Sequence, residues 1–260
     1  MLNLANLKPP PVGFGKCGYC PYREAGPAAL CFACARQTIG DLSARKCNTC
    51  DLPMEKDDVE CSNPLCSFDD RWFTWNYAVA MKSGSLDAAI KRYKFDNKKG
   101  WADIFARILV GFFEDQRNVF EGFNLIVASP SYVSKDDSSK GRDWNHTRLV
   151  LEKAHVESRG EWPFDVDLAE PAIIKTVPTP RMTNNSWKQR HQIAKNELRP
   201  SLHIPDITRT KGKTILVYDD VFTDGHTLNE VARCLIKDGG AVEVCGVTLA
   251  RQPWRKKKAA

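Results

Sequence analysis

Residues 214–227, TILVYDDVFTDGHT, decide the fold of this chain. The first five residues are apolar and largely β-branched, which indicates a buried strand. Asp219 and Asp220 follow at once, and residues 227–237 then place apolar side chains at helical spacing. A strand that passes through a short polar loop into a helix is typical of parallel α/β domains. In such domains ligands bind beyond the carboxyl ends of the strands.

The loop has the chemistry needed to hold a ribose phosphate. Asp219 and Asp220 can accept hydrogen bonds from neighbouring hydroxyls, and Thr223 and Thr227 can donate through their own hydroxyls. Gly225 permits a close approach of the backbone to a phosphate, and the following helix adds its positive N-terminus. The candidate ligand-binding residues are Asp219, Asp220, Val221, Phe222, Thr223, Asp224, Gly225, His226 and Thr227. The alternative is an acidic turn that caps a helix and binds nothing.

The remainder of residues 71–251 alternates between strand and helix patterns. Strands are predicted at 71–81, 124–128, 172–177, 214–218 and 242–249, and helices at 85–95, 101–113, 144–156, 187–196 and 227–237. This alternation predicts an α/β domain with a mostly parallel sheet flanked by helices. The sequence has neither a GxGxxG motif nor a P-loop lysine motif, which excludes the usual dinucleotide and nucleoside triphosphate sites.

Eight of the ten cysteines form a short N-terminal series of paired motifs. They are Cys17, Cys20, Cys31, Cys34, Cys47, Cys50, Cys61 and Cys66. Two Cys-x-x-Cys turns can complete a tetrahedral zinc site, so we predict two structural Zn²⁺ ions in place of disulfides, a redox pair or an iron–sulfur cluster. Successive pairing and cross-braced pairing both remain open. Cys234 and Cys245 lie within an apolar helix and strand, and we expect them to be buried.

Composition sets the wider limits. The chain has 260 residues, a formal charge of +6 and no apolar run of the about 20 residues that a membrane helix needs. We expect a cytoplasmic protein without membrane insertion. It would comprise a leader at 1–16, a cysteine-rich zinc-binding module at 17–68, the α/β domain at 71–251 and a basic tail at 252–260. The mild positive charge permits a nucleic-acid partner without requiring one.

DDVFTDGHT resembles the motif that binds phosphoribosyl pyrophosphate (PRPP) in type I phosphoribosyltransferases, whose usual form is DDVxTTGxT. Together with the preceding cysteine motifs it resembles the ComF and GntX proteins. Four further segments are similar to that family: residues 88–100 (AAIKRYKFDNKKG), 127–131 (VASPS), 141–146 (GRDWNH) and 190–196 (RHQIAKN).

The resemblance implies a PRPP site and a reaction in which a nitrogen nucleophile displaces pyrophosphate from C1 of PRPP. Asp219 and Asp220 would be the catalytic residues and would lie near the ribose, with Mg²⁺ on the pyrophosphate and ribose oxygens. Ser129 would approach the pyrophosphate, as would Arg181 from a lid at 178–185. Asp224 replaces the usual threonine, so PRPP binding is the firmer expectation and turnover the weaker one. We expect the Asp224 carboxylate to point away and cap the helix, and His226 to face solvent.

Two other functions compete with catalysis. One is a non-catalytic protein that binds single-stranded DNA in DNA uptake or processing. The basic cluster at 91–99, the tail at 255–258 and the tryptophans would support it. The other is a regulator that senses PRPP.

Overall fold

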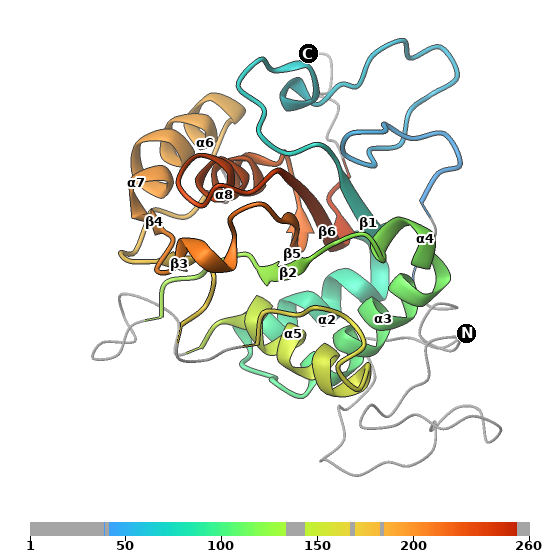
Figure 1. Cartoon of the computed structure of the whole chain (residues 1–260). Helices are drawn as coiled ribbons and strands as arrows, with labels where there is room; N and C mark the ends of the chain where they lie inside the picture. Colours follow the sequence, from blue (N-terminus) through green and yellow to red (C-terminus); the bar gives the residue numbers. More distant parts are fainter. Residues whose placement is uncertain (1–38, 40–41, 134–143, 167–169, 183–184, 254–260) are drawn as a thin grey trace, which may run out of the picture.

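A four-stranded parallel sheet forms the centre of the molecule (Figure 1). The computed structural model describes residues 39, 42–133, 144–166, 170–182 and 185–253. The strand order is β1-β6-β5-β2, and each neighbouring pair is parallel. The strands are β1 (Asn76–Met81), β2 (Leu125–Ala128), β5 (Thr214–Phe222) and β6 (Glu243–Arg251). The predicted parallel sheet is therefore confirmed.

One face of the sheet is covered by the helices that lie between residues 84 and 157. These are α2 (Gly84–Phe95), α3 (Trp101–Asp115) with the short α4 (Arg117–Phe120), and α5 (His146–Glu157). Figure 1 shows them together on one side of the strands. Aromatic side chains fill this layer, and Trp101, Phe105 and Phe113 are each at most 1% exposed. The three main helices lie close to their predicted ranges.

The opposite face carries α8 (His226–Lys237) and a longer helical segment. That segment runs through α6 (Trp187–Ile193), a π-helical stretch (Ala194–Leu198) and α7 (Arg199–Ser201). Gly246 of β6 allows α8 to lie close to the sheet, because a Cβ there would be 2.5 Å from Cδ2 of Leu228. Cys234 of α8 and Cys245 of β6 are both buried, as predicted, and they lie in the core clusters on opposite faces of the sheet.

The strand predicted at 172–177 does not join the main sheet. Only β3 (Ile174–Lys175) forms, and it pairs antiparallel with β4 (Leu202–His203) in a separate two-stranded sheet. Val177 is 51% exposed, and the prolines at 178 and 180 cannot donate ladder hydrogen bonds. A 3₁₀ turn, η4 (Ile207–Arg209), then leads towards β5.

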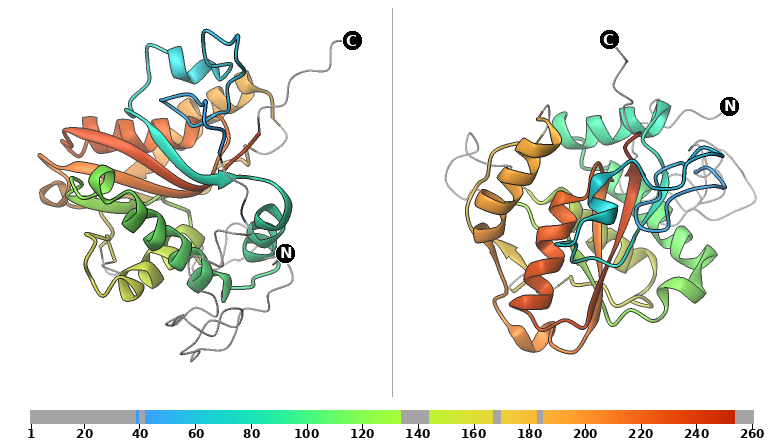
Figure 2. Two further views of the ribbon diagram at one scale, coloured as in Figure 1. Left: turned by 90° about the vertical axis from the view of Figure 1, so that its right-hand side faces the viewer. Right: turned by 90° about the horizontal axis from the view of Figure 1, so that it is seen from above.

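The cysteine-containing segment at 42–75 lies over the same side of the sheet as α8 (Figure 2). It includes the 3₁₀ turn η2 (Pro64–Ser67). Cys50 and Leu65 belong to one buried cluster with Val217 of β5 and Val231 of α8. The segment therefore shares its core with the α/β domain. Among the described residues, no helix is long and apolar enough to cross a membrane.

Candidate functional site

A three-residue loop, Thr223–Gly225, joins the end of β5 to the start of α8. Gly225 has φ +94°, and a Cβ there would lie 2.5 Å from Cζ of Phe222 and 2.9 Å from Cδ2 of Leu65. Only glycine fits this turn. Gly225 is also the N-cap of α8, and no described side chain caps that helix. The first backbone N–H groups of α8 thus have no acceptor within the helix, which is the arrangement that binds anions. We call Thr223–Gly225 the phosphate loop, after the ligand that the sequence predicts for it.

The two consecutive aspartates lie within β5, which continues four residues past its predicted end. Asp219 is partly exposed, and its Oδ1 accepts a 2.8 Å hydrogen bond from the Asp220 backbone N–H. Asp220 is only 3% exposed. Its carboxylate forms an ion pair with Lys94 of α2 and lies 3.3 Å from Nε2 of His146 at the start of α5. The two acids are therefore in different environments, with Asp219 the more accessible.

His146, Asp219 and Asp220 could together hold a cation, since one ligand atom from each lies within 4.8 Å of the others. Mg²⁺ prefers oxygen ligands and keeps several waters, so the two carboxylates suit it and the histidine does not. Lys94 already balances the charge of Asp220. Asp219, the more exposed of the two acids, is accordingly the carboxylate more available to a cation.

Ser129 lies at the carboxyl end of β2, at the same edge of the sheet as the aspartates. Its N–H donates to the Tyr218 carbonyl at 2.8 Å, and its carbonyl accepts from Thr147 Oγ1 at 2.7 Å. Ser129 is buried at 5% exposure. The sheet thus brings Ser129 and the acids to one edge, as the parallel order requires. The GRDWNH segment is described only from Trp144 onward, and 141–143 lie outside the described residues.

Asp224 does not cap α8, so that expectation was wrong. Gly225 occupies the cap position, and Oδ2 of Asp224 lies 3.1 Å from Nη1 of Arg190 in α6. The Asp224 side chain is 7% exposed. The backbone carbonyl of Asp224 accepts a 3.1 Å hydrogen bond from Nδ2 of Asn63. A buried carboxylate needs such a partner. The charge that would repel a phosphate is therefore balanced by Arg190.

His226 is buried at 2% exposure, so the expectation that it faces solvent was wrong. Its ring centroid lies 5.0 Å from that of Trp187 and 5.4 Å from that of His191. Trp187 and His191 stack on one another with an interplanar angle of 2°. Burial lowers the pKa of His226, and the nearby Asp224 carboxylate offsets part of that shift. A neutral ring therefore fills the space beneath the start of α8.

The segment predicted as a lid reaches the first turn of α8 through Met182. Its Sδ lies 3.8 Å from Oγ1 of Thr227. Arg181 is exposed, and its carbonyl accepts a 2.8 Å hydrogen bond from Nδ2 of Asn185. Residues 183 and 184 of this segment lie outside the described residues. Met182, rather than Arg181, contacts the candidate site.

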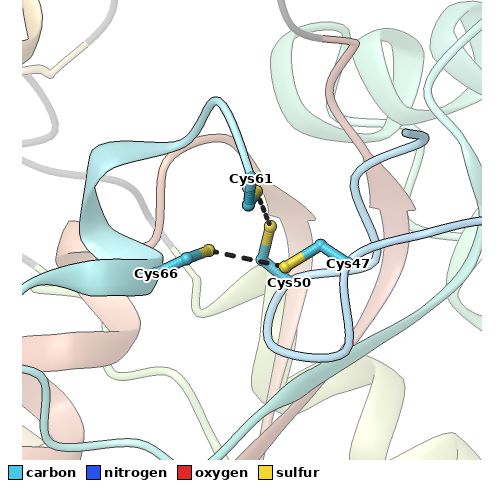
Figure 3. Close-up of side chains that lie close together, drawn as sticks. All are labelled: Cys47, Cys50, Cys61 and Cys66. Atoms are coloured by element: carbon cyan, nitrogen blue, oxygen red, sulfur yellow. Dashed lines mark hydrogen bonds between the residues drawn. The ribbon is translucent and has the colours of Figure 1, made fainter. Parts of the chain in front are cut away.

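Cys47, Cys50, Cys61 and Cys66 converge on one point beside the phosphate loop (Figure 3). Their sulfurs all lie within 4.8 Å of one another, with Cys47–Cys66 at 3.8 Å and Cys50–Cys61 at 3.7 Å. Four sulfurs at about 2.3 Å from a tetrahedral zinc would be about 3.8 Å apart. All four are free thiols. The residues therefore fit a structural Zn²⁺. The ion would cross-link two short segments, residues 47–50 and 61–66, which we call the two knuckles.

This geometry selects the successive pairing for the second half of the cysteine series, and cross-braced pairing is wrong for these four residues. The first four cysteines, Cys17, Cys20, Cys31 and Cys34, lie outside the described residues. The pKa of Cys50 falls to about 6. Its contact with Cys47 raises this pKa. Hydrogen bonds with Cys61 and Cys66 and the charge of Arg251 together lower the pKa by more than that. Burial raises the pKa of both Cys234 and Cys245 to about 12.

Sequence reasoning missed several residues that shape the site. Lys94 had been assigned only to a basic cluster, and His146 and Arg190 only to segments that resemble a family. Arg251 ends an apolar strand yet is 0% exposed. A charged residue at the end of a buried strand was the one signal that could have identified it, because buried charges need partners.

The sheet, the phosphate loop and the paired acids lie in an α/β domain that is similar to phosphoribosyltransferases. Residues 175–259 match the family model described as Phosphoribosyl transferase domain. The chain is also similar to DNA utilization protein YhgH of Escherichia coli (strain K12), with 24% identity over 233 residues, or 87% of this chain and 93% of that protein. The protein of the same name from Shigella flexneri matches with the same identity and coverage.

Proposed function

We propose that this protein binds PRPP at the carboxyl edge of β5. The observation that carries the proposal is the β5–loop–α8 unit, in which Asp219 lies near the end of β5 and α8 begins at His226 without a side-chain cap. The ribose hydroxyls would hydrogen-bond to Asp219, and the 5′-phosphate would accept from the first N–H groups of α8. The matched phosphoribosyl transferase domain model supports the same ligand.

Mg²⁺ would accompany the ligand and supply charge neutralisation on its pyrophosphate. Asp219 would orient the ribose. Asp220, held by Lys94 and His146, would fix the strand end on which Asp219 stands. Phosphoribosyl transfer to a nitrogen acceptor is the further step that this arrangement would support. It would form a C1–N bond, release pyrophosphate and pass the acceptor's proton to solvent.

The test of binding is calorimetric titration with PRPP and Mg²⁺. Asp219→Asn is the sharpest variant, because the amide oxygen can still accept the Asp220 N–H while the charge is lost. We expect at least about tenfold weaker binding, equivalent to about 1.4 kcal/mol. Asp238→Asn on the exposed end of α8 is the matched control and should bind as the native chain does. Native affinity in the Asp219→Asn variant would contradict the proposal.

Turnover is tested separately by pyrophosphate release from PRPP with a panel of bases and amines. Release that depends on an acceptor would establish a transferase. Saturable binding without release would instead favour a protein that senses PRPP or uses it as a structural ligand.

A second candidate function is binding of single-stranded nucleic acid, and one surface favours it. Phe95 at the end of α2 is 67% exposed, although it is a large aromatic residue. Lys91, Arg92, Lys98 and Lys99 around it are exposed as well. An exposed ring among cations suits a stacked base with phosphates on either side. The similarity to proteins named for DNA utilization supports this candidate.

A further inference from the structure

Arg251 joins the four-cysteine site directly to the phosphate loop. Its guanidinium is buried at the end of β6, with 0% of the residue exposed. On one side Nε donates to the Cys50 carbonyl at 2.8 Å, and Nη2 lies 3.6 Å from the Cys50 sulfur. On the other side Nη1 donates to the carbonyls of Thr223 at 2.6 Å and Phe222 at 3.2 Å. One side chain therefore holds a cysteine knuckle and the phosphate loop together.

Asn63 forms a second connection from the other knuckle. It stands between Cys61 and Cys66 and is fully buried. Its N–H donates to the Cys61 sulfur at 3.5 Å, while its Nδ2 donates to the Asp224 carbonyl at 3.1 Å. The same residue thus contacts a candidate metal ligand and the backbone of the loop.

Leu65 provides a third contact, through packing. It is 0% exposed, and its Cδ2 lies 2.9 Å from where a Cβ of Gly225 would stand. Because Gly225 has no side chain, Leu65 and Phe222 occupy the space where one would stand. The left-handed turn at Gly225 is therefore enclosed on the side of the cysteine segment.

The cysteine segment has little regular structure with which to hold these contacts. In its described part, residues 42–75, it contains one 3₁₀ turn and an isolated bridge between Lys46 and Pro53. Segments of this kind take their folding free energy from the bound metal. The positions of Asn63, Leu65 and the Cys50 carbonyl therefore depend on whether the four sulfurs are held together.

We propose that Arg251 and Asn63 make the phosphate loop dependent on the metal in the four-cysteine site. With metal bound, the carbonyls of residues 222–224 are fixed and the first N–H groups of α8 are pre-organised for an anion. Without it, the loop opens locally while the rest of the α/β domain stays folded. The functional consequence rests on the proposed PRPP site, but the coupling itself does not. Arg251 and Asn63 are positioning residues.

Hydrogen exchange of the full chain tests the coupling without PRPP. In zinc-loaded protein and after removal of zinc with a chelator, exchange is followed in peptides covering residues 219–229 and α3 (Trp101–Asp115). We expect chelation to speed exchange at 222–228 by at least tenfold and to leave α3 unchanged. Unchanged exchange in the loop would overturn the proposal, and so would simultaneous loss of protection in α3, which would indicate global unfolding.

The variant Asn63→Ala separates the contact from the metal. We expect full zinc content and faster exchange at 222–228, because the hydrogen bond to the Asp224 carbonyl is lost. Cys245→Ser, a buried thiol outside the cluster, is the control and should keep both zinc and loop protection. Native loop protection in zinc-loaded Asn63→Ala would contradict the assigned role of Asn63.

PRPP titration then separates this inference from the proposed function. We expect zinc-free protein to bind PRPP at least tenfold more weakly than zinc-loaded protein. If the zinc-loaded native chain does not bind PRPP, the proposed function fails and the exchange experiment still decides the coupling. If both metal states bind equally and loop exchange is also unchanged, the inference fails. If both bind equally although chelation speeds loop exchange, the coupling stands and the loop is not the PRPP site.

Discussion

Arg190 Nη1 lies 3.1 Å from Asp224 Oδ2, and this ion pair explains how the phosphate loop can carry an aspartate where similar motifs carry threonine. The pair is largely buried, with side-chain exposures of 24% and 7%. Arg190 comes from α6, so the helix that covers the start of α8 also neutralises the loop. The substitution at 224 and the arginine at 190 form one unit.

The first prediction concerns this pair. Arg190→Ala should destabilise the protein by about 2 kcal/mol, because Asp224 keeps a buried charge without its partner. It should also weaken PRPP binding by at least tenfold. Asp224→Asn in the same chain should restore most of both losses, whereas Gln192→Ala, on an exposed residue of the same helix, should change neither. Chemical denaturation and calorimetry measure these effects, and the absence of rescue by Asp224→Asn would contradict the account.

The turn at Gly225 gives a second prediction. Gly225→Ala places a methyl group at φ +94° and against Phe222 and Leu65, so it should cost at least about 1 kcal/mol and weaken PRPP binding. Gly122→Ala is the matched control, since nothing lies within 4 Å of its Cβ position. Thermal unfolding of both variants provides the comparison. Equal midpoints would show that the left-handed turn is not required.

Metal content is the subject of the third prediction. Cys50→Ser and Cys66→Ser should each lower the bound zinc by one equivalent per chain relative to the native protein. Cys234→Ser and Cys245→Ser should lower it by none, because those thiols lie apart from the cluster. Elemental analysis of the purified chains measures the ratio. Full zinc content in both Cys50→Ser and Cys66→Ser would contradict the assigned ligand set.

Stability should fall in mild acid because of His226. Its pKa is lowered in the folded state, chiefly by burial, whereas the unfolded chain titrates near 6.5. The unfolded state therefore takes up the proton first, and the contribution of His226 is complete above about pH 6.5. It decreases as the pH falls towards the lower folded-state value, with a slope of up to about 1.4 kcal/mol per pH unit.

Denaturant unfolding between pH 5 and 7.5 measures this dependence. His226→Phe should reduce the slope because it removes the titrating ring. His203→Gln, on an exposed residue of β4, should leave the slope unchanged. An unaltered slope in His226→Phe would assign the acid sensitivity to other groups.

Nucleic-acid binding gives a further prediction. A labelled single strand should bind most tightly at low salt, because phosphate contacts release counterions. Phe95→Ala should weaken the binding of this strand by about 1–3 kcal/mol, the usual range for one stacked base. Val156→Ala, at an exposed apolar residue of α5, should have no effect. No binding at low salt would remove this function.

Much of the fold follows from local pattern. The helices at 84–95, 101–115 and 226–237 and the four core strands were predicted because each has a clear apolar periodicity. The prediction that 172–177 joins the main sheet was wrong, because a short apolar run does not specify which strand it pairs with. The Cys-x-x-Cys motifs predicted metal ligands, but only spatial proximity could show that Cys47 and Cys50 meet Cys61 and Cys66.

The candidate site was predicted only where it is local in sequence. Asp219, Asp220 and Gly225 lie in one continuous motif. The contacts of Lys94, Arg190 and Arg251 with that motif come from distant segments, and no local pattern predicts such partners. These partners are required by burial, because the carboxylates of Asp220 and Asp224 can be buried only with cations beside them.

Calorimetric titration of the zinc-loaded native chain with PRPP and Mg²⁺, beside Asp219→Asn, tests the central claim most directly. The account predicts saturable binding to the native chain and at least tenfold weaker binding to the variant. No binding to the native chain, or equal affinity in the two proteins, would contradict it.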